Sequence, residues 1–371
     1  MLAAVRLEGV ELRVVHLPLV TPFTTSFGTQ TVREAIVVRA RTSDGDGWGE
    51  IVTQEAPVYS SEYTRGAWDV AERFLVPALL SPAAVAPGEV ASILHPFLGH
   101  RMVKAGLELA VLDAALRTAG QSLASHLGAT NTRIPSGVSV GIQRDPSALV
   151  DAVAAYLDAG YVRIKIKIEP GRDLGDTAAV RAAFPGIPLQ VDANSAYTLD
   201  DIDTLAGLDR FGLLMVEQPL GDDDLVDHAA LARRISTPIC LDESITSEKA
   251  ARDALTLGAA AVINVKAGRV GGYLEALRIH DLCRAAGTPV WCGGMLETGI
   301  GRAANAALAA LPGFTLPGDV SASDRFYARD IVIDPIALDD GHVRVPTGPG
   351  IGADVDEAAL EEVTVARLDL R

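Results

Sequence analysis

The chain has 371 residues, of which 49% are hydrophobic, which is enough for a large core and for two domains. Its formal net charge is -16, so nucleic acid and anionic membranes are disfavoured as partners. No stretch approaches the ~18 apolar residues of a membrane span, and residues 1–15 alternate in charge too early for a secretory signal peptide. We therefore expect a soluble, cytoplasmic protein.

The first 130 residues predict strands followed by helices. Residues 9–20 and 35–52 are strand-like, and the second stretch contains a Ser-Asp-Gly-Asp-Gly turn. Between them, TPFTTSFGTQ (residues 21–30) has no clear period and predicts a loop that carries Phe23 and Phe27. Apolar stripes predict helices over about 60–81 and 99–128.

From residue 134 onward, short apolar strands alternate with helical patterns. Eight such units over roughly 190 residues favour a (β/α)8-type barrel over an open doubly wound sheet. The strands are expected at 135–142, 162–168, 188–194, 212–218, 238–244, 261–267, 289–295 and, weakly, 314–319. The tail from residue 342 returns to the texture of the N-terminal region, so we expect it to pack on that region.

The second of these strands, VRIKIKIE (residues 162–169), alternates strictly between apolar and charged residues. On a solvent-facing strand its two lysines would be ordinary surface charges. Inside a protein, two ammonium groups require a specific reason. In a barrel, Lys165 and Lys167 would point inward while the isoleucines pack outward against helices.

Charged residues end five successive strands at a nearly constant spacing. Lys167, Asp192, Glu217, Asp242 and Lys266 are separated by 25, 25, 25 and 24 residues. One βα unit takes about that many residues, so these groups are expected at one level of the C-terminal face of the barrel. A single acidic residue at a strand end is commonly a helix cap or a surface charge. Five groups at one spacing favour a functional site.

The residue types indicate a reaction class. Asp192, Glu217 and Asp242 form a hard-oxygen set suited to Mg²⁺. Lys167 and Lys266 would flank the metal, and a lysine near a metal ion, Lys165 and Arg269 should have a lowered pKa suited to a general base. The metal would bind a substrate carboxylate and stabilise the enediolate that forms when a lysine removes the α-proton. Return of the proton on the other face gives racemisation, and loss of a β-leaving group gives dehydration.

The chain resembles the muconate-lactonising-enzyme subgroup of the enolase superfamily, and within it the N-succinylamino acid racemase and o-succinylbenzoate synthase family. Enzymes of this superfamily use a Lys or His base with one or two Mg²⁺ ions. The resemblance runs nearly end to end and rests on TPFTTSFGTQ, GVSVGI, IKIKIEPG, VDANSAYTL, EQPL, CLDES, GRVGGYLEA, PVWCGGMLETGIGRAAN and LPGDVSASDR.

The resemblance implies an α+β capping domain over a (β/α)7β barrel, with the cap formed by residues 1–130 and 326–371 and the barrel by 131–325. It implies Mg²⁺, for which Mn²⁺ or Co²⁺ can substitute, and Lys167 and Lys266 as the acid/base pair. Residues implied to touch substrate or its surroundings are Lys165 and Asn194 for the carboxylate, Ser139, Gly294, Met295, Phe23 and Phe27 for the acyl pocket, and Glu243 and Arg269 behind them. Arg269 would tune Lys266 or form a loop-to-helix salt bridge. The resemblance also implies a homo-oligomer that acts on a small carboxylate. The reaction would be a step of menaquinone biosynthesis, the racemisation of N-acylamino acids, or both.

Other sequence patterns suggest alternatives to this assignment. GVSVG (137–141) matches the serine-hydrolase pattern, but its valines favour a strand over the required sharp turn. GIGRAA (299–304), with Asp319 20 residues beyond its start, matches a dinucleotide fingerprint, but a lone match is weak. A non-catalytic member, a muconate cycloisomerase and a dipeptide epimerase remain, although Asp319 and Asp324 are too far apart for the epimerase's Asp-x-Asp. Cys240, Cys283 and Cys292 indicate buried thiols in a reducing compartment and no disulfide framework.

Overall fold

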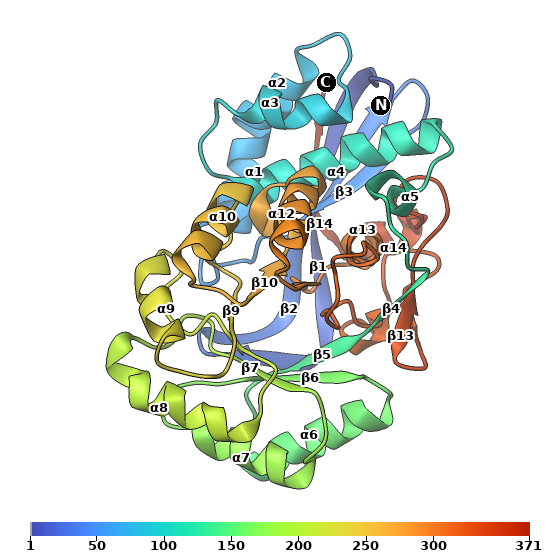
Figure 1. Cartoon of the computed structure of the whole chain (residues 1–371). Helices are drawn as coiled ribbons and strands as arrows, with labels where there is room; N and C mark the ends of the chain where they lie inside the picture. The colour runs from blue at the N-terminus through green and yellow to red at the C-terminus, as the bar shows by residue number, and fades with distance from the viewer. Residues whose placement is uncertain (1) are drawn as a thin grey trace.

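The computed structural model describes residues 2–371 and contains two main sheets (Figure 1). The antiparallel sheet has the order β14-β1-β2-β3, and the parallel sheet has the order β11-β10-β9-β8-β7-β6-β5. Among residues 2–371, no helix is both long enough and apolar enough to cross a membrane.

The antiparallel sheet is built mainly from the first 51 residues and from the end of the chain. Its strands are β1 (Leu7–Thr25), β2 (Gly28–Thr42), β3 (Gly47–Ile51) and β14 (Thr364–Leu370). β14 pairs with β1 in register Val10↔Leu370 to Val15↔Thr364, so the end of the chain packs on the N-terminal strand. One face of this sheet packs on helices α1 (Thr64–Val70), α2 (Val76–Leu80), α3 (Val90–Leu94) and α4 (Arg101–Thr118), with a π-helical turn, Ala71–Leu75, between α1 and α2.

The prediction of a loop over residues 21–30 is wrong. β1 continues to Thr25 and β2 begins at Gly28, so the segment is the tip of a long β-hairpin. Pairing shifts between Pro18↔Val32 and Phe23↔Gln30, and this irregularity breaks the period-two pattern in the sequence. The single helix expected over about 99–128 is in fact two helices, α4 and α5 (Leu123–Leu127). The sequence analysis did not predict α3.

The parallel sheet curls into a barrel, which confirms the predicted fold class. Its strands are β5 (Gly137–Val140), β6 (Arg163–Lys167), β7 (Leu189–Asp192), β8 (Val216–Glu217), β9 (Ile239–Leu241), β10 (Val262–Val265) and β11 (Val290–Cys292). Between β11 and β5, the weakly predicted segment 314–319 completes the ring through single bridges. Gly137 N donates to Gly318 O at 2.8 Å, and Asp319 N donates to Cys292 O at 2.8 Å.

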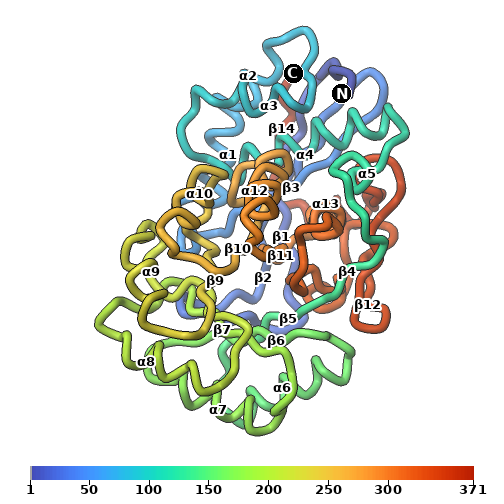
Figure 2. Tube along the Cα trace, in the orientation of Figure 1, coloured from blue at the N-terminus to red at the C-terminus, as the bar shows by residue number. Residues whose placement is uncertain are grey.

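Helices cover the outside of the barrel, and the long hairpin reaches across to it (Figure 2). The helices are α6 (Pro146–Asp158), α7 (Asp173–Ala183), α8 (Ile202–Gly207), α9 (Leu225–Ala232), α10 (Glu248–Leu257), α11 (Ala267–Val270), α12 (Tyr273–Ala286) and α13 (Gly299–Ala309). A small sheet of β4 (Arg133–Pro135), β12 (Leu338–Asp339) and β13 (His342–Arg344) precedes α14 (Glu357–Val363). Ile164 and Ile166 are fully buried in the core that includes the helices. A separate apolar cluster contains Met215, Cys240, Val262 and Trp291.

Candidate active site

The charged residues at the strand ends meet inside the barrel mouth. Lys167, Asp192 and Glu217 are the last residues of β6, β7 and β8, and Asp242 and Lys266 directly follow β9 and β10. All five are at most 8% exposed. Because the isoleucines of β6 lie in the outer core, its lysines point inward, as the alternating pattern predicts.

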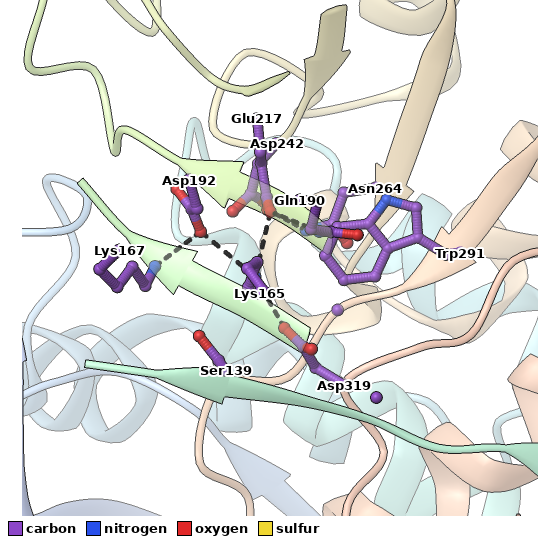
Figure 3. A network of polar contacts seen from close by, with 12 residues as sticks. Ser139, Lys165, Lys167, Gln190, Asp192, Glu217, Asp242, Asn264, Trp291 and Asp319 are labelled. Atoms are coloured by element: carbon purple, nitrogen blue, oxygen red, sulfur yellow. Dashed lines mark hydrogen bonds and ion pairs between the residues drawn. The ribbon is translucent and has the colours of Figure 1, made fainter. Parts of the chain in front are cut away.

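Ion pairs connect these groups inside the barrel, and Figure 3 shows those of Lys165 and Lys167. Lys167 Nζ lies 2.6 Å from Asp192 Oδ2, and Lys266 Nζ lies 2.7 Å from Asp242 Oδ2. Lys165 Nζ lies 3.2 Å from Asp192 Oδ2 and 3.1 Å from Glu217 Oε2. Each buried carboxylate therefore has a cation beside it, which offsets part of its desolvation cost.

Asp319 belongs to this network, although sequence reasoning gave it no such role. Its Oδ2 lies 2.7 Å from Lys165 Nζ, and its Oδ1 accepts from Arg163 Nη2 at 2.8 Å. Asp319 is therefore engaged inside the barrel and is not free to bind a ribose, as the dinucleotide alternative requires.

Two amides that the sequence analysis missed hold Glu217. Asn264 Nδ2 donates to Glu217 Oε1 at 2.8 Å, and Gln190 Nε2 donates to Glu217 Oε2 at 3.4 Å. Asn264 lies two residues before Lys266, and Gln190 lies two residues before Asp192. The period of two that identified Lys165 would have found both amides.

Tyr59 enters the site from the loop that follows β3, and no sequence signal points to it. Its Oη donates to Asp242 Oδ1 at 3.2 Å and accepts from Lys266 Nζ at 3.1 Å. The ring centroid lies 4.6 Å from Lys266 Nζ. The antiparallel domain therefore contributes a side chain to the barrel's ion-pair network.

The carboxylates around Lys266 and Lys165 raise the pKa values of both lysines. Burial lowers the pKa of Lys266, but the charges of Tyr59, Glu243 and Glu217 raise it above its ordinary value. Burial likewise lowers the pKa of Lys165, but the charges of Asp319, Glu217 and Asp192 outweigh this effect and raise the pKa above its ordinary value. The carboxylates beside each ammonium group outweigh its desolvation, and the expected lowering beside a bound cation stays a prediction.

Arg269 contacts a carboxylate and not Lys266. Its guanidinium pairs with Asp242, while Nε donates to Ile245 O at 2.7 Å and Nη2 donates to Asn264 O at 2.6 Å. The residue lies on α11 and Asp242 follows β9, so the loop-to-helix salt bridge is present. Asp242 is thus shared between Lys266 and Arg269.

A cavity with about 720 Å³ of space, part of it open to solvent, lies over the ion-pair network. All the side chains expected to touch substrate line it: Phe23, Phe27, Ser139, Lys165, Lys167, Asn194, Lys266, Gly294 and Met295. Asp192, Glu217 and Asp242 are absent from the lining, and the ammonium groups paired with them line it instead.

The hairpin tip is fixed against the barrel beside this cavity. Ile142 N donates to Thr24 O at 2.9 Å, and a Cβ on Gly141 would lie 2.8 Å from the same oxygen. Glycine at 141 therefore allows the tip to approach, which places Phe23 and Phe27 over the cavity.

Asn194 connects the lysine side of the cavity with Glu243. Its Oδ1 accepts from Lys167 Nζ at 2.6 Å, and its Nδ2 donates to Glu243 Oε1 at 2.8 Å. Burial raises the pKa of Glu243 to about 7, with Asp192 adding to the effect. Glu243 therefore lies behind Asn194, as expected.

The three carboxylates at the strand ends offer the oxygen ligands that a hard cation such as Mg²⁺ prefers. Asp192, Glu217 and Asp242 supply only oxygen atoms, from adjacent strands, and are at most 1% exposed. In the described part of the chain, no three acidic, histidine or cysteine side chains converge as a formed metal centre. The carboxylate oxygens are turned toward ammonium groups instead, and the magnesium site stays a prediction.

The serine-hydrolase alternative is not supported by the position of Ser139. The residue lies inside β5 and not at a sharp strand-to-helix turn. Its Oγ is buried and has no hydrogen-bond partner within residues 2–371, so no base contacts it there.

Comparison with known proteins agrees with this architecture. Residues 9–128 match the family "Mandelate racemase / muconate lactonizing enzyme, N-terminal domain", and residues 148–359 match "Enolase C-terminal domain-like". The chain is 58% identical to an N-succinylamino acid racemase from Amycolatopsis over 98% of its length and 99% of the relative. It is 49% identical to an o-succinylbenzoate synthase from Geobacillus kaustophilus over 97% of its length and 96% of the relative. A crystal structure of an enolase superfamily member from Listeria innocua superposes with a TM-score of 0.94 at 40% identity, covering 99% of each chain.

Proposed function

The chain belongs to the enolase superfamily of enzymes, and we propose that it removes the α-proton of small carboxylates by a two-lysine mechanism. The substrates are N-acylamino acids such as N-succinylamino acids, which it racemises, and the cyclohexadiene precursor that it dehydrates to o-succinylbenzoate. One observation carries the proposal. Lys167 and Lys266 line a single cavity from β6 and β10, which lie four strands apart in a ring of eight segments and so on opposite sides.

Asp192, Glu217 and Asp242 would hold Mg²⁺, for which Mn²⁺ or Co²⁺ can substitute. The cation would supply positive charge for the substrate carboxylate, as metal ions do in such sites. Lys165 and Asn194 orient that carboxylate, since both line the cavity and both contact the acidic network.

The two lysines exchange protons with opposite faces of the α-carbon. In racemisation, one Nζ takes the proton from the α-carbon and the other Nζ delivers a proton to the opposite face. In dehydration, one Nζ takes the α-proton, the bond to the β-hydroxyl breaks, and a lysine ammonium group gives the departing hydroxyl the proton with which it leaves as water. Both reactions share the first step.

The wall near Asp319 favours an N-acyl group over a free ammonium group. A dipeptide would present its ammonium group to a pair of carboxylates, but Asp319 is already paired with Lys165 and Arg163. Ser321 lines the cavity two residues later, whereas Asp324 is exposed and does not line it. Dipeptide epimerisation is therefore the weaker candidate.

Proton NMR in D₂O with Mg²⁺ tests the function directly. With N-succinyl-L-phenylalanine, the α-proton signal should disappear and the D-enantiomer should accumulate. A parallel ultraviolet assay follows dehydration to o-succinylbenzoate. EDTA should stop both reactions and added Mg²⁺ should restore them. Absence of both reactions in folded, metal-loaded protein would refute the proposal.

Single lysine variants test the two-sided mechanism. We expect Lys266→Ala to lose racemisation while still exchanging the α-proton of the one enantiomer that faces Lys167. Lys167→Ala should exchange only the other enantiomer. Both enantiomers of N-succinylphenylalanine are incubated separately in D₂O, with circular dichroism as the folding control. Undiminished racemisation by either variant would remove that lysine from the mechanism.

A further inference from the structure

A carboxylate from the antiparallel domain caps a helix of the barrel. Glu50 lies on β3 and is 3% exposed. Its oxygens accept from Thr298 N at 3.0 and 3.1 Å, from Thr298 Oγ1 at 2.7 Å and from Gly301 N at 3.0 Å. These donors lie at the start of α13, where backbone N–H groups lack partners within the helix.

This contact explains the glycines of the GIGRAA motif. A Cβ on Gly301 would lie 2.8 Å from Glu50 Oε2, and a Cβ on Gly299 would lie 2.2 Å from Val332 Cγ2. Both glycines therefore allow close packing within the protein. The amide groups that would hold a pyrophosphate in a dinucleotide site are already engaged, because Thr298 N and Gly301 N donate to Glu50 and Gly299 N donates to Asp330.

The segment directly before α13 is a wall of the active-site cavity. Gly294, Met295, Leu296 and Glu297 all line the cavity. Leu296 has a φ of 53°, in the left-handed region that a leucine rarely adopts, so the surrounding contacts must hold the segment. Glu297 Oε1 accepts from Met295 N and from Asn305 Nδ2, each at 2.9 Å.

We propose that Glu50 is a positioning residue that sets substrate selectivity. By capping α13 it fixes residues 294–297, which line the cavity. The inference rests on the proposed function for its substrate class. Glu50 itself does not line the cavity, so it acts through the segment and not by touching substrate.

A second interdomain cap in the chain is a matched control. Glu108 on α4 is 2% exposed, and its Oε1 accepts from Leu274 N at 3.0 Å, at the start of α12. The preceding Gly271 and Gly272 do not line the cavity. Glu50→Gln and Glu108→Gln thus make the same substitution at two interdomain helix caps, and only the cap at Glu50 adjoins the cavity.

Amide hydrogen exchange of the free proteins tests the positioning role without any substrate. We expect Glu50→Gln to speed exchange in residues 293–301 by about tenfold and to leave residues 271–276 unchanged. Glu108→Gln should show the reverse pattern. Unchanged exchange at 293–301 in Glu50→Gln would overturn the proposal. If the wild-type enzyme does not act on N-acylamino acids, the proposed function fails, and this measurement still decides whether Glu50 holds the segment.

Steady-state kinetics separate a selectivity role from a merely structural one. With N-acetyl-, N-succinyl- and N-benzoylamino acids, Glu50→Gln should raise KM about tenfold for the preferred acyl group, reduce discrimination among the three, and change kcat less than about threefold. Glu108→Gln should leave the KM values unchanged. Faster exchange at 293–301 with unaltered KM values would mean that Glu50 only stabilises the fold, and would overturn the proposal.

A pair of variants at Thr298 tests the same contact if Glu50→Gln does not fold. Thr298→Val removes the hydroxyl that donates to Glu50, and Thr298→Ser keeps it. We expect the valine variant to show the raised KM and the serine variant to match the wild type. Equal KM values in the two variants would contradict the proposal.

Discussion

At the scale of single residues, Gly293 leaves room for Lys266, one of the two lysines proposed to move protons. A Cβ there would lie 2.3 Å from Asn264 Oδ1 and 2.7 Å from Lys266 Cε. We expect Gly293→Ala to fold but to lower kcat about 10- to 100-fold, since a displaced catalytic group is costly. The racemisation assay measures the loss. Gly175→Ala is the control, because nothing lies within 4 Å of its Cβ. Equal activity of both variants would contradict the expectation.

Lys165 is the cation shared by the buried Asp192 and Glu217 and the partly buried Asp319. Its Nζ lies within 3.2 Å of Asp192, Glu217 and Asp319. In EDTA, Lys165→Met should lower the free energy of unfolding by about 3–5 kcal/mol, because the remaining anions are buried without it. Urea unfolding measures the change. Lys249→Met, which breaks only the exposed pair with Asp253, should cost less than about 1 kcal/mol. Similar costs for both variants would argue against this role of Lys165.

At the scale of elements, the cap of α12 makes stability depend on pH. Burial raises the pKa of Glu108 from 4.5 to about 7. Between those values the folded protein binds more protons than the unfolded chain, so stability falls as pH rises through this window. We expect Glu108→Gln to remove this dependence. Relative to the variant, the wild type should lose about 1–3 kcal/mol between pH 5 and pH 8.

Urea unfolding of wild type and Glu108→Gln at both pH values measures the difference. Parallel pH profiles for the two proteins would show that Glu108 does not titrate in this range in the folded state. Asp200→Asn is a suitable control, because it also replaces one carboxylate and Asp200 is exposed at the start of a 3-10 turn.

At the scale of the whole molecule, the end of the chain completes the antiparallel sheet. β14 pairs with β1, and Arg367 Nη2 lies 2.6 Å from the buried Glu11. Deleting residues 364–371 would leave β1 as an unpaired edge. We expect a lower Tm, by roughly 2–4 °C for each kcal/mol lost, and more self-association by light scattering. Arg367→Gln should change Tm less, because the strand remains. An unchanged Tm in the truncated chain would contradict this.

The sequence predicted the barrel and its charged strand ends because both depend on regular periods. Alternation placed Lys165 and Lys167 inside, and the near-constant spacing placed the carboxylates at one level. Tyr59 could not be predicted, since it reaches the site through the docking of two domains and not through any local pattern. The hairpin tip was missed because irregular pairing around Pro18 hides its alternation. The lysine pKa directions depend on distances that no linear spacing contains.

The hairpin tip that carries Phe23 and Phe27 is separate in the chain from both lysines proposed to move protons. It closes the cavity from β1 and β2, while Lys167 and Lys266 belong to the barrel. Mutations in the tip can therefore accumulate and alter which molecules are accepted while the chemistry stays intact. Laboratory evolution toward a new substrate should accordingly begin with a library confined to residues 21–30.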